Sequence, residues 1–481
     1  MGTARSGIGW LIAQMGALAV AWIASIYFAR TLSDPQTSLG TFYAFETVVT
    51  FLVLLANGGL NEAIVKRVSE GRDPEQFATA GLLLSMLLVI TVSAGTLLAS
   101  QLLINFFNFG GISVLVIVVT IISYQVRDTL GALLASKFQV GRSGAINFAN
   151  SIGQVAVQVS LVSIGFGAVG LMIGYMAGAV FASLIAVYLV SNRFNIALPA
   201  KHHIYSLIRF ARYSFLNNFV QKFYDNIDII IITVLLGTSS TGVYGIGFRF
   251  SLLVMVIYSA ITRSVTPEIS RLDMEGNKGR IRELLNDSIV LGLFFGIPAL
   301  AGFGVLARPI IVTFYTEEFA SAAIIAFGAV ATRIPEGLRS TASAVLSGMD
   351  RPDITFRGGA ILMITNLVLD LILVPTIGIQ GAVVASFAGM SLQLLYLMYY
   401  LFSILDLSYV DLPGREVLAE VLAALVMAGV VYAVRTRLSG MSAALLAGLV
   451  LLGVITYITV IIGVSGGVRR RVFGIARTVI P

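Results

Sequence analysis

Residues 212–237 read RYSFLNNFVQKFYDNIDIIIITVLLG, and this stretch decides the fold class. As an α-helix it is long enough to cross the ~30 Å hydrocarbon layer of a membrane. Its ends enclose three charged residues, Lys222, Asp225 and Asp228. A charge at that depth is costly unless it faces a partner or a water-filled cavity, so such residues commonly belong to a functional site. We therefore expect this helix to line a polar pathway through the membrane.

The composition of the whole chain is that of a membrane protein. Hydrophobic residues make up 57% and charged residues 11% of its 481 residues, and the mean hydropathy is +0.94. Apolar runs recur from one end to the other, which excludes a soluble domain of this length. The first run, 8–29, exceeds the apolar core of a signal peptide, so we expect it to remain as a span. The absence of cysteine excludes disulfides, thiol catalysis and a Cys-ligated metal.

The apolar runs predict an all-α polytopic fold with fourteen transmembrane helices. The expected spans are 8–29, 39–62, 78–100, 112–136, 145–165, 168–190, 212–236, 243–265, 285–306, 319–347, 355–376, 379–404, 414–434 and 441–463.

The basic residues set the expected orientation. Of the 31 Lys and Arg residues, five lie deep inside the spans, four in the outside loops and 22 in the inside segments when the N-terminus is placed inside. The 22 include Arg212, Arg263, Arg357 and Arg415, which lie at the inner ends of spans. This asymmetry follows the positive-inside rule, so we expect a multi-pass protein of the cytoplasmic membrane with both termini in the cytoplasm. The net charge of +7 is then explained by loops and a basic tail at 468–477 that face an anionic leaflet, without a nucleic-acid partner.

Charged residues inside the expected spans are unusually frequent. The basic ones are Arg127, Lys222, Arg249, Arg333 and Arg339, and the acidic ones are Glu46, Glu62, Asp128, Asp225, Asp228, Glu336 and Asp370. Counted from the membrane faces, they form a ladder of mixed charge across the bilayer. For each residue alone, pairing that holds helices together is as good an interpretation as a role in a cavity. Glu62 and Asp370 lie near span ends, where a side chain can reach the interface.

A polar stripe adds to this pattern in the fifth expected span. Asn147, Asn150, Gln154 and Gln158 are spaced three or four residues apart, so they lie on one helical face. Two interpretations stay open, namely a polar lining of a cavity and hydrogen bonding between helices, and the second is slightly favoured.

A weak internal repeat divides the chain into two halves. Three glycines of one interhelical turn, Gly167, Gly170 and Gly178, recur 211 residues later, and LGTFY at 39–43 corresponds to TGVYG at 241–245. Six spans per half is an even number, so both halves have the same orientation, as in transporters whose halves rock about a central site. We expect an N-terminal lobe at 1–190, a cytoplasmic linker at 191–211, a C-terminal lobe at 212–404, and two extra spans with the basic tail at 405–481.

Two patterns that are known from soluble enzymes do not fit their surroundings in this chain. Residues 165–170, GFGAVG, spell a dinucleotide-binding pattern, but they join two spans and follow no strand. His202 and His203 stand in the linker without spaced carboxylate or cysteine partners, so a solvated loop is favoured over a metal site. We therefore expect no enzyme activity, no cofactor and no metal.

Several short motifs resemble those of a known family. They are YFARTLS at 27–33, LGTFY at 39–43 and NGGLNEAIV at 57–65, with NID at 226–228, GVY at 242–244 and TPEIS at 266–270 in the second half. Together they resemble polysaccharide flippases, the O-antigen-unit translocase branch of the multidrug/oligosaccharidyl-lipid/polysaccharide exporter superfamily. The likeness covers nearly the whole chain, and none of the motifs is a catalytic signature.

The resemblance implies two lobes around a central cavity, and alternating access that moves a lipid-linked oligosaccharide from the inner to the outer leaflet. The carrier is a polyprenyl or dolichyl phosphate or diphosphate. In this family basic residues in the cavity are held to engage the phosphate and the sugar, and charge-assisted hydrogen bonds suit that role. The positions available here are Lys222, Arg249, Arg333, Arg339 and Arg127. We expect a monomer surrounded by membrane lipids.

The acidic residues leave the coupling and the substrate class open. The candidates for coupling or for cavity charge are Asp225, Asp228, Glu46, Glu336 and Asp128, with a proton or a sodium ion as the coupling ion. Asp225 and Asp228 either change partners with Lys222 during transport or form a permanent salt bridge, and the two are equally favoured. A cation-coupled multidrug or toxin antiporter is the alternative function. A scaffold that transports nothing is a third class, in which the buried charges would be dispensable.

Overall fold

The computed structural model describes residues 2–107, 111–137, 140–191, 195–438 and 440–468. Within these ranges it contains sixteen α-helices and two short 3₁₀ helices and no strand, which confirms the all-α prediction. Residues 469–477 of the expected basic tail lie outside the described residues. The chain divides into two units, Met1–Gly242 (unit 1) and Val243–Pro481 (unit 2).

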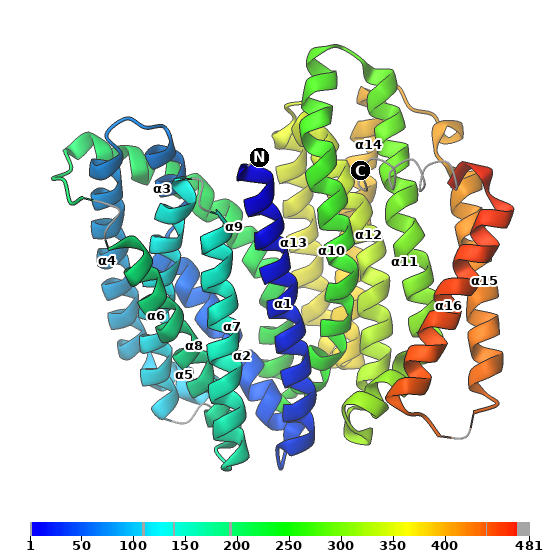
Figure 1. Ribbon diagram of the computed structural model, residues 1–481, viewed down its shortest axis with the longest axis horizontal. Helices are drawn as coiled ribbons and strands as arrows, with labels where there is room; N and C mark the ends of the chain where they lie inside the picture. The colour runs from blue at the N-terminus through cyan, green and yellow to red at the C-terminus, as the bar shows by residue number, and fades with distance from the viewer. Residues whose placement is uncertain (1, 108–110, 138–139, 192–194, 439, 469–481) are drawn as a thin grey trace. The chain divides into compact units, whose positions relative to one another are not determined.

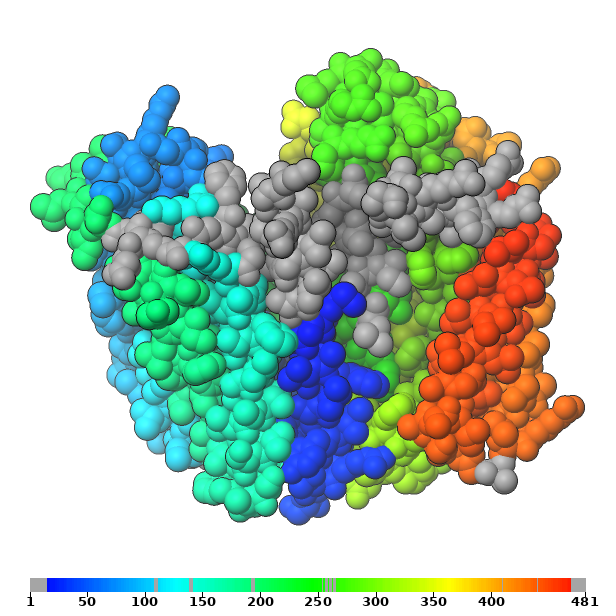
Figure 2. Space-filling view, viewed as in Figure 1, coloured from blue at the N-terminus to red at the C-terminus, as the bar shows by residue number. Residues whose placement is uncertain are grey.

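Unit 1 holds nine helices and the first residues of a tenth (Figure 1). They are α1 (Gly2–Thr31), α2 (Pro35–Asn57), α3 (Leu60–Ser69), α4 (Pro74–Leu98), α5 (Ser100–Phe107), α6 (Ile112–Ser136), α7 (Val140–Ser163), α8 (Gly167–Val190) and α9 (Lys201–Leu236). Asp34 starts α2 by accepting a hydrogen bond from the Thr37 N–H at 3.2 Å, ahead of Pro35 in the first turn. Ile64, Leu133 and Leu207 are fully buried where α3, α6 and α9 meet. In Figure 2 the described part of α1 lies along α7.

Unit 2 holds the rest of the chain. Its helices are α10 (Thr238–Met274), α11 (Lys278–Phe314), α12 (Ala322–Gly348), α13 (Pro352–Ile377), α14 (Ile379–Ile404), α15 (Gly414–Arg435) and α16 (Ala443–Val464), with 3₁₀ turns η1 (Glu317–Phe319) and η2 (Tyr409–Asp411). Helix α12 packs against α11 and α14, and α15 packs against α11 and α16. Figure 1 shows α15 and α16 side by side at one edge of this unit.

Every expected span overlaps one of these helices, and ten helices of the described residues are long and apolar enough to cross a membrane. The chain is therefore a multi-pass membrane protein. Helices α9, α10 and α12 are not among the ten, and they carry the charges at 222–228, 249 and 333–339. The charges that mark a candidate site thus lower the apolar signal of the helices that hold them. The count of fourteen spans stays a prediction.

The expected second span, 39–62, is two helices. Gly58 and Gly59 both have positive φ angles, of 55° and 75°, and they end α2 before α3 begins. A Cβ atom at Gly59 would lie 2.2 Å from the Ala211 carbonyl oxygen of α9, so only glycine permits this approach. Glu62 therefore belongs to the short helix α3, where the Asn218 side-chain amide donates to its carboxylate at 3.0 Å.

Helix α9 packs against α2, α3 and α4, so the units defined by contacts divide the chain after this helix, at Gly242. The internal repeat predicts a different division, with lobes at 1–190 and 212–404 and a linker at 191–211. That division describes the symmetry of the chain and stays a prediction. The helices expected to lie outside the repeat, α15 and α16, contact α11 in the described residues.

Candidate functional site

A cluster of three charged residues on α12 forms a buried ionic site in unit 2. Arg333, Glu336 and Arg339 follow one another at intervals of three, which places them on one face of the helix. Pro335 lies among them and removes one backbone hydrogen bond of the helix. The side chains of Arg333 and Glu336 are only 4% and 7% exposed, and that of Arg339 is 14% exposed.

The Arg333 guanidinium is held from three directions. It forms an ion pair with Glu336, donates to the Ser251 hydroxyl at 2.8 Å, and lies over the Phe248 ring at 4.8 Å from its centroid. Ser251 and Phe248 belong to α10, so α10 holds a charged side chain of α12 in place. Arg339 is 3.9 Å from the other Glu336 oxygen. Two guanidinium groups therefore share one carboxylate, and the cluster carries an excess positive charge.

A cavity of about 180 Å³ adjoins this cluster. Its lining residues are Met255, Tyr258, Thr262, Arg333, Glu336, Gly337 and Ser340. A water molecule takes about 30 Å³ in the liquid, so the cavity has room for several waters or for a small anionic group. The excess positive charge next to it favours an anion.

Unit 1 contains a second charged pair, on α6. The Arg127 guanidinium contacts the Asp128 carboxylate at 2.6 Å and lies over the Tyr124 ring at 4.2 Å from its centroid. A cavity of about 240 Å³ adjoins this pair. It is lined by Asn61, Arg127, Asp128, Gly131, Ala132, Ala135, Ser143, Ile146 and Asn147. Here one arginine meets one carboxylate, so the pair is neutral as a whole.

Aromatic rings pack next to the Arg127 pair. Tyr175 of α8 contacts Phe42 and Phe45 of α2 edge-on, and its ring centroid is 5.3 Å from that of Tyr124. Glu46, on α2, interacts electrostatically with Tyr124 and Tyr175. The assignment of Glu46 to a ladder of charge across the bilayer stays a prediction.

The face of α9 that carries Lys222, Asp225 and Asp228 is divided between surface and interior. Lys222 and Asp225 are exposed, whereas Asp228 is 7% exposed. The Gln221 side-chain amide donates to Asp225 at 2.9 Å, and no ion pair joins Lys222 to Asp225 in the described part of the chain. The expected exchange of partners on this face stays a prediction.

The polar stripe on α7 mostly faces α8. The Gln158 side-chain amide donates to the Leu171 carbonyl at 2.9 Å. A Cβ atom at Gly174 would lie 2.3 Å from Gln158, and one at Gly178 would lie 2.6 Å from Gln154. At Asn150 it is the backbone carbonyl oxygen, and not the side chain, that lies close to Gly178. Asn147 differs, because it lines the cavity beside Arg127.

Arg249, the remaining predicted cation, is half-buried on α10 beside Phe248. Two carboxylates of unit 2 are fully buried. Asp370 on α13 lies one turn after Asn366, whose amide donates to the Ser386 hydroxyl at 3.2 Å. Glu420 on α15 is also fully buried and was missed. Its signal was a carboxylate six residues inside the apolar run 414–434.

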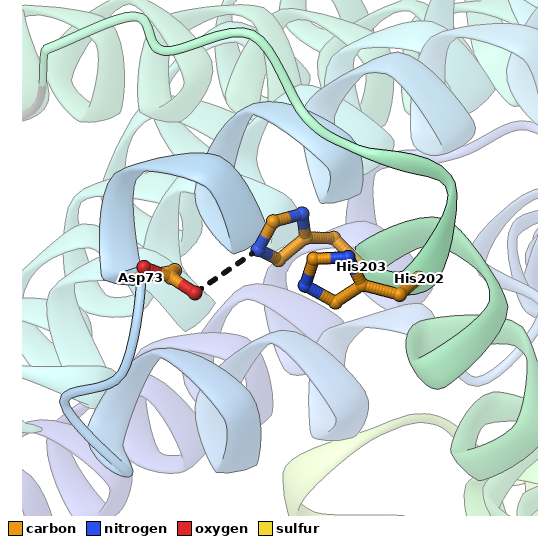
Figure 3. Close-up of side chains that lie close together, drawn as sticks. All are labelled: Asp73, His202 and His203. Carbon is orange, nitrogen blue, oxygen red and sulfur yellow. Dashed lines mark hydrogen bonds and ion pairs between the residues drawn. The ribbon is translucent and has the colours of Figure 1, made fainter.

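His203 corrects another expectation, that the histidine pair stands in a solvated loop without a carboxylate partner. Its Nε2 atom lies 3.4 Å from Asp73 Oδ2 (Figure 3), its ring is 4% exposed, and its Nδ1 atom accepts a hydrogen bond from the Ala200 N–H at 3.0 Å. Because Nδ1 accepts, Nε2 carries the proton in the neutral ring and donates to Asp73. The ring thus has no free nitrogen for a metal in this arrangement. It anchors the first turn of α9 to the start of α4.

Comparisons with known proteins agree with this fold. A family model described as polysaccharide biosynthesis protein matches residues 27–324. The probable low-salt glycan biosynthesis flippase Agl15 of Haloferax volcanii is 24% identical over 436 residues, which cover 91% of this chain and 90% of that protein.

Solved structures show the same architecture. The lipid II flippase MurJ in an inward closed conformation superposes with a TM-score of 0.77 at 19% identity, covering 94% of this chain and 98% of its own. An inward-facing multidrug resistance MATE family transporter of the MOP superfamily superposes with a TM-score of 0.63 at 15% identity, covering 83% and 98%. At these identities the likeness establishes the fold.

Proposed function

Since the chain belongs to the family of polysaccharide biosynthesis proteins, we propose that it is a flippase that moves a lipid-linked oligosaccharide from the inner to the outer leaflet of the cytoplasmic membrane. The carrier is a polyprenyl or dolichyl phosphate or diphosphate. The relative Agl15 is named as a probable glycan biosynthesis flippase, which supports this substrate class. The protein catalyses no chemical step in this proposal, and it works by alternating access.

One observation carries the proposal, namely the excess positive charge of the α12 cluster beside a cavity. Arg333 is fixed by Ser251, Phe248 and Glu336, so its guanidinium is preorganised rather than free to rotate. A phosphate that leaves water needs charge-assisted hydrogen bonds in compensation, and a planar guanidinium supplies two parallel donors. The lipid tail stays in the bilayer, so the protein needs to shield only the head group.

The remaining predicted cations extend this role. Lys222 is exposed on α9 and Arg249 is half-buried on α10, and we assign both to contacts with the phosphate or the sugar. Arg339 supplies the second positive charge around Glu336. Coupling to a proton or a sodium ion, through carboxylates such as Asp225 and Asp228, belongs to the same proposal, as do the monomeric state and the cytoplasmic termini.

A cation-coupled multidrug or toxin antiporter is the second candidate. The similarity to a MATE family transporter favours it, and so do the buried carboxylates Asp228, Asp370 and Glu420. In that function carboxylates would bind the substrate cation and the arginines would only balance charge. The two functions therefore assign opposite roles to Arg333 and Glu336.

Reconstituted vesicles distinguish the two functions. We expect the purified protein to move a fluorescent lipid-linked oligosaccharide between leaflets, and Arg333→Ala, Lys222→Ala and Arg249→Ala each to slow that movement. Arg249→Lys should be tolerated in part if a point charge suffices, and poorly if two parallel hydrogen bonds are needed. Arg271→Ala is the matched control, because Arg271 is exposed and pairs with Glu275 outside the cavity.

The antiporter would give the reverse result. Uptake of an amphipathic cation into the vesicles, unaffected by the arginine substitutions and without movement of the lipid-linked oligosaccharide, would overturn the proposal. Normal lipid movement in all three alanine variants would remove the cavity assignment. Mass spectrometry of lipids that accumulate when the gene is removed then identifies the sugar and the carrier.

A further inference from the structure

The cavity beside the Arg127 pair in unit 1 collects polar side chains from three helices. Asn61 belongs to α3, Arg127 and Asp128 belong to α6, and Ser143 and Asn147 belong to α7. Helix α6 packs against both α3 and α7, so one cavity of about 240 Å³ adjoins all of these side chains. The convergence of a few polar groups on one cavity is the usual form of a site for a small polar ligand.

The ion pair on α6 leaves part of each charged group unused. The Arg127 Nε and Nη2 atoms contact the same oxygen of Asp128, Oδ1, at 2.7 and 2.6 Å. The other carboxylate oxygen, Oδ2, and the third guanidinium nitrogen, Nη1, have no hydrogen-bond partner among the described residues. The pair therefore keeps a strong acceptor and a strong donor for a ligand, although its net charge is zero.

A buried network fixes the orientation of the Asn61 side chain. The Thr129 hydroxyl of α6 lies 3.4 Å from Asn61 Oδ1 and 3.3 Å from the Ser85 hydroxyl of α4. The Gln125 side-chain amide donates to the Thr129 oxygen at 3.2 Å, and all three residues of this network are buried. Because the carbonyl oxygen of Asn61 faces the network, its N–H groups remain as donors for the cavity.

Small residues of α6 keep the α7 side of the cavity open. Gly131 and Ala135 are one turn apart on α6, Ser143 and Asn147 are one turn apart on α7, and all four line the cavity. A Cβ atom on Gly131 would lie 3.6 Å from the Ser143 hydroxyl oxygen, so the two helices approach closely here. Within the described ranges, neither the Ser143 hydroxyl nor the Asn147 side-chain amide makes a hydrogen bond.

The charge balance and the free groups select the class of ligand. An anion would meet the Asp128 carboxylate and a cation the Arg127 guanidinium, so the pair gives neither a net attraction. The free groups comprise donors on Arg127 and Asn61, an acceptor on Asp128, and groups on Ser143 and Asn147 that both donate and accept. A hydroxyl also donates and accepts, so an uncharged ligand with several hydroxyls satisfies this mixed set.

We propose that this cavity binds a sugar unit, which its polar side chains hold through the sugar hydroxyls. The Asn147 amide places a donor and an acceptor side by side, so it can bond two neighbouring hydroxyls and distinguish their arrangement on the ring. The preference for a polyol follows from the cavity itself. The assignment of the sugar to the lipid-linked oligosaccharide rests on the proposed function.

Saturation-transfer NMR tests the cavity without a lipid or a transport step. The purified protein, in a detergent without a sugar head group, is mixed with the methyl glycosides of glucose, galactose, mannose and N-acetylglucosamine. We expect transfer to at least one glycoside, and about tenfold weaker binding in Asn147→Leu, which removes the amide and keeps a similar volume. The matched control is Asn105→Leu, because Asn105 is exposed on α5 and does not line the cavity.

Ala135→Leu fills the cavity and keeps every polar group. We expect it to weaken glycoside binding as Asn147→Leu does, and it carries the test if Asn147→Leu does not fold. The proposal is overturned if no glycoside receives saturation, or if both cavity variants bind like Asn105→Leu. Displacement of the bound glycoside by inorganic phosphate indicates an anion site, and displacement by phosphoethanolamine indicates a site for a zwitterion. Either result also overturns the proposal.

Vesicles separate this proposal from the proposed function. We expect Asn147→Leu and Ala135→Leu to slow the movement of a lipid-linked oligosaccharide, and Asn105→Leu to leave it unchanged. Glycoside binding in a protein that moves no lipid-linked oligosaccharide overturns the proposed function and leaves the sugar site intact. Normal movement in both cavity variants, when they bind no glycoside, leaves the proposed function intact and overturns the assignment of this site to the substrate.

Discussion

The charged site on α6 of unit 1 pairs one arginine with one carboxylate, whereas in the site on α12 of unit 2 two arginines share one carboxylate. Arg127 and Asp128 are neighbours in sequence on α6, and the Asp128 side chain is 31% exposed. Arg333 and Glu336 are three residues apart on α12 and are nearly inaccessible. Both arginines lie over an aromatic ring, Tyr124 or Phe248, so the two sites use the same cation–π support.

The difference in charge balance predicts different ligands. The neutral pair of unit 1 offers both a donor and an acceptor to its cavity, which suits hydroxyl groups such as those of a sugar. The cluster of unit 2 has one arginine in excess, which suits a phosphate. We therefore expect the phosphate of the substrate to bind in unit 2, and substitutions there to have the larger effects.

The largest effect is expected for Arg333→Leu. It leaves the buried Glu336 with Arg339, 3.9 Å away, as its remaining ion-pair partner among the described residues, so unfolding should become easier by about 3–5 kcal/mol. Thermal unfolding in detergent measures this loss. Lipid movement should stop in vesicles.

The double variant Arg333→Leu with Glu336→Leu separates stability from function. Replacing a buried ion pair by apolar side chains is commonly neutral, so stability should return to within about 1 kcal/mol of the original protein. Lipid movement should not return, because the cation is absent. Recovery of both would show that the pair is only structural.

A smaller effect is expected for Arg127→Leu in unit 1. The remaining Asp128 carboxylate is partly exposed to a cavity that water can enter, so the loss should be about 1–3 kcal/mol. The same unfolding measurement gives the comparison with Arg333→Leu. Equal losses in the two variants would contradict the difference drawn between the units.

A still smaller change in stability is expected for Arg339→Ala. Its contact with Glu336 is long, so its removal should cost less than about 1 kcal/mol. Arg339→Ala also removes the excess positive charge of the cluster. It should therefore weaken the binding of the substrate head group and make that binding less sensitive to salt. Titration of a soluble head-group analogue at two salt concentrations tests this, with Arg271→Ala as the control.

No change in stability is expected from the last test, which locates the two faces of unit 2. The chain lacks cysteine, so single substitutions Glu275→Cys and Glu318→Cys, both at exposed positions, give unique labels. The positive-inside rule predicts that an impermeant reagent outside the cell labels residue 318 and not residue 275. Labelling of both from one side would contradict the fourteen-span prediction.

The positions of the helices were predictable, because apolar runs of membrane length leave few alternatives to a helix. The break at Gly58 and Gly59 was not predicted, although two glycines after Asn57 are a local signal for a helix end. The close approach of α9 to Gly59, which the sequence does not show, explains why a glycine is required there. The count of spans is ambiguous for a related reason. Charges in α9, α10 and α12 reduce the signal by which a span is recognised.

The contacts of the site were predictable where both residues lie on one helix, and they were not where the residues lie on different helices. Arg333 with Glu336 follows from a spacing of three residues, and so does their common face. Ser251 as a partner of Arg333, and Asp73 as a partner of His203, come from helices far away in the sequence, and no local pattern indicates them. Glu420 was available to the same rule that found the other buried charges.

The close packing of the Tyr258 ring against Gly337 of α12 also constrains how this chain can change over time. An aromatic ring at position 258 and a bare backbone at position 337 require each other, since any β-carbon there would lie 2.0 Å from the ring. If Gly337 were replaced first, the Tyr258 ring would have to move. A smaller residue must therefore replace Tyr258 before or together with that change. Among related chains, a side chain larger than hydrogen at the position of Gly337 should therefore be found with a small aliphatic residue at the position of Tyr258.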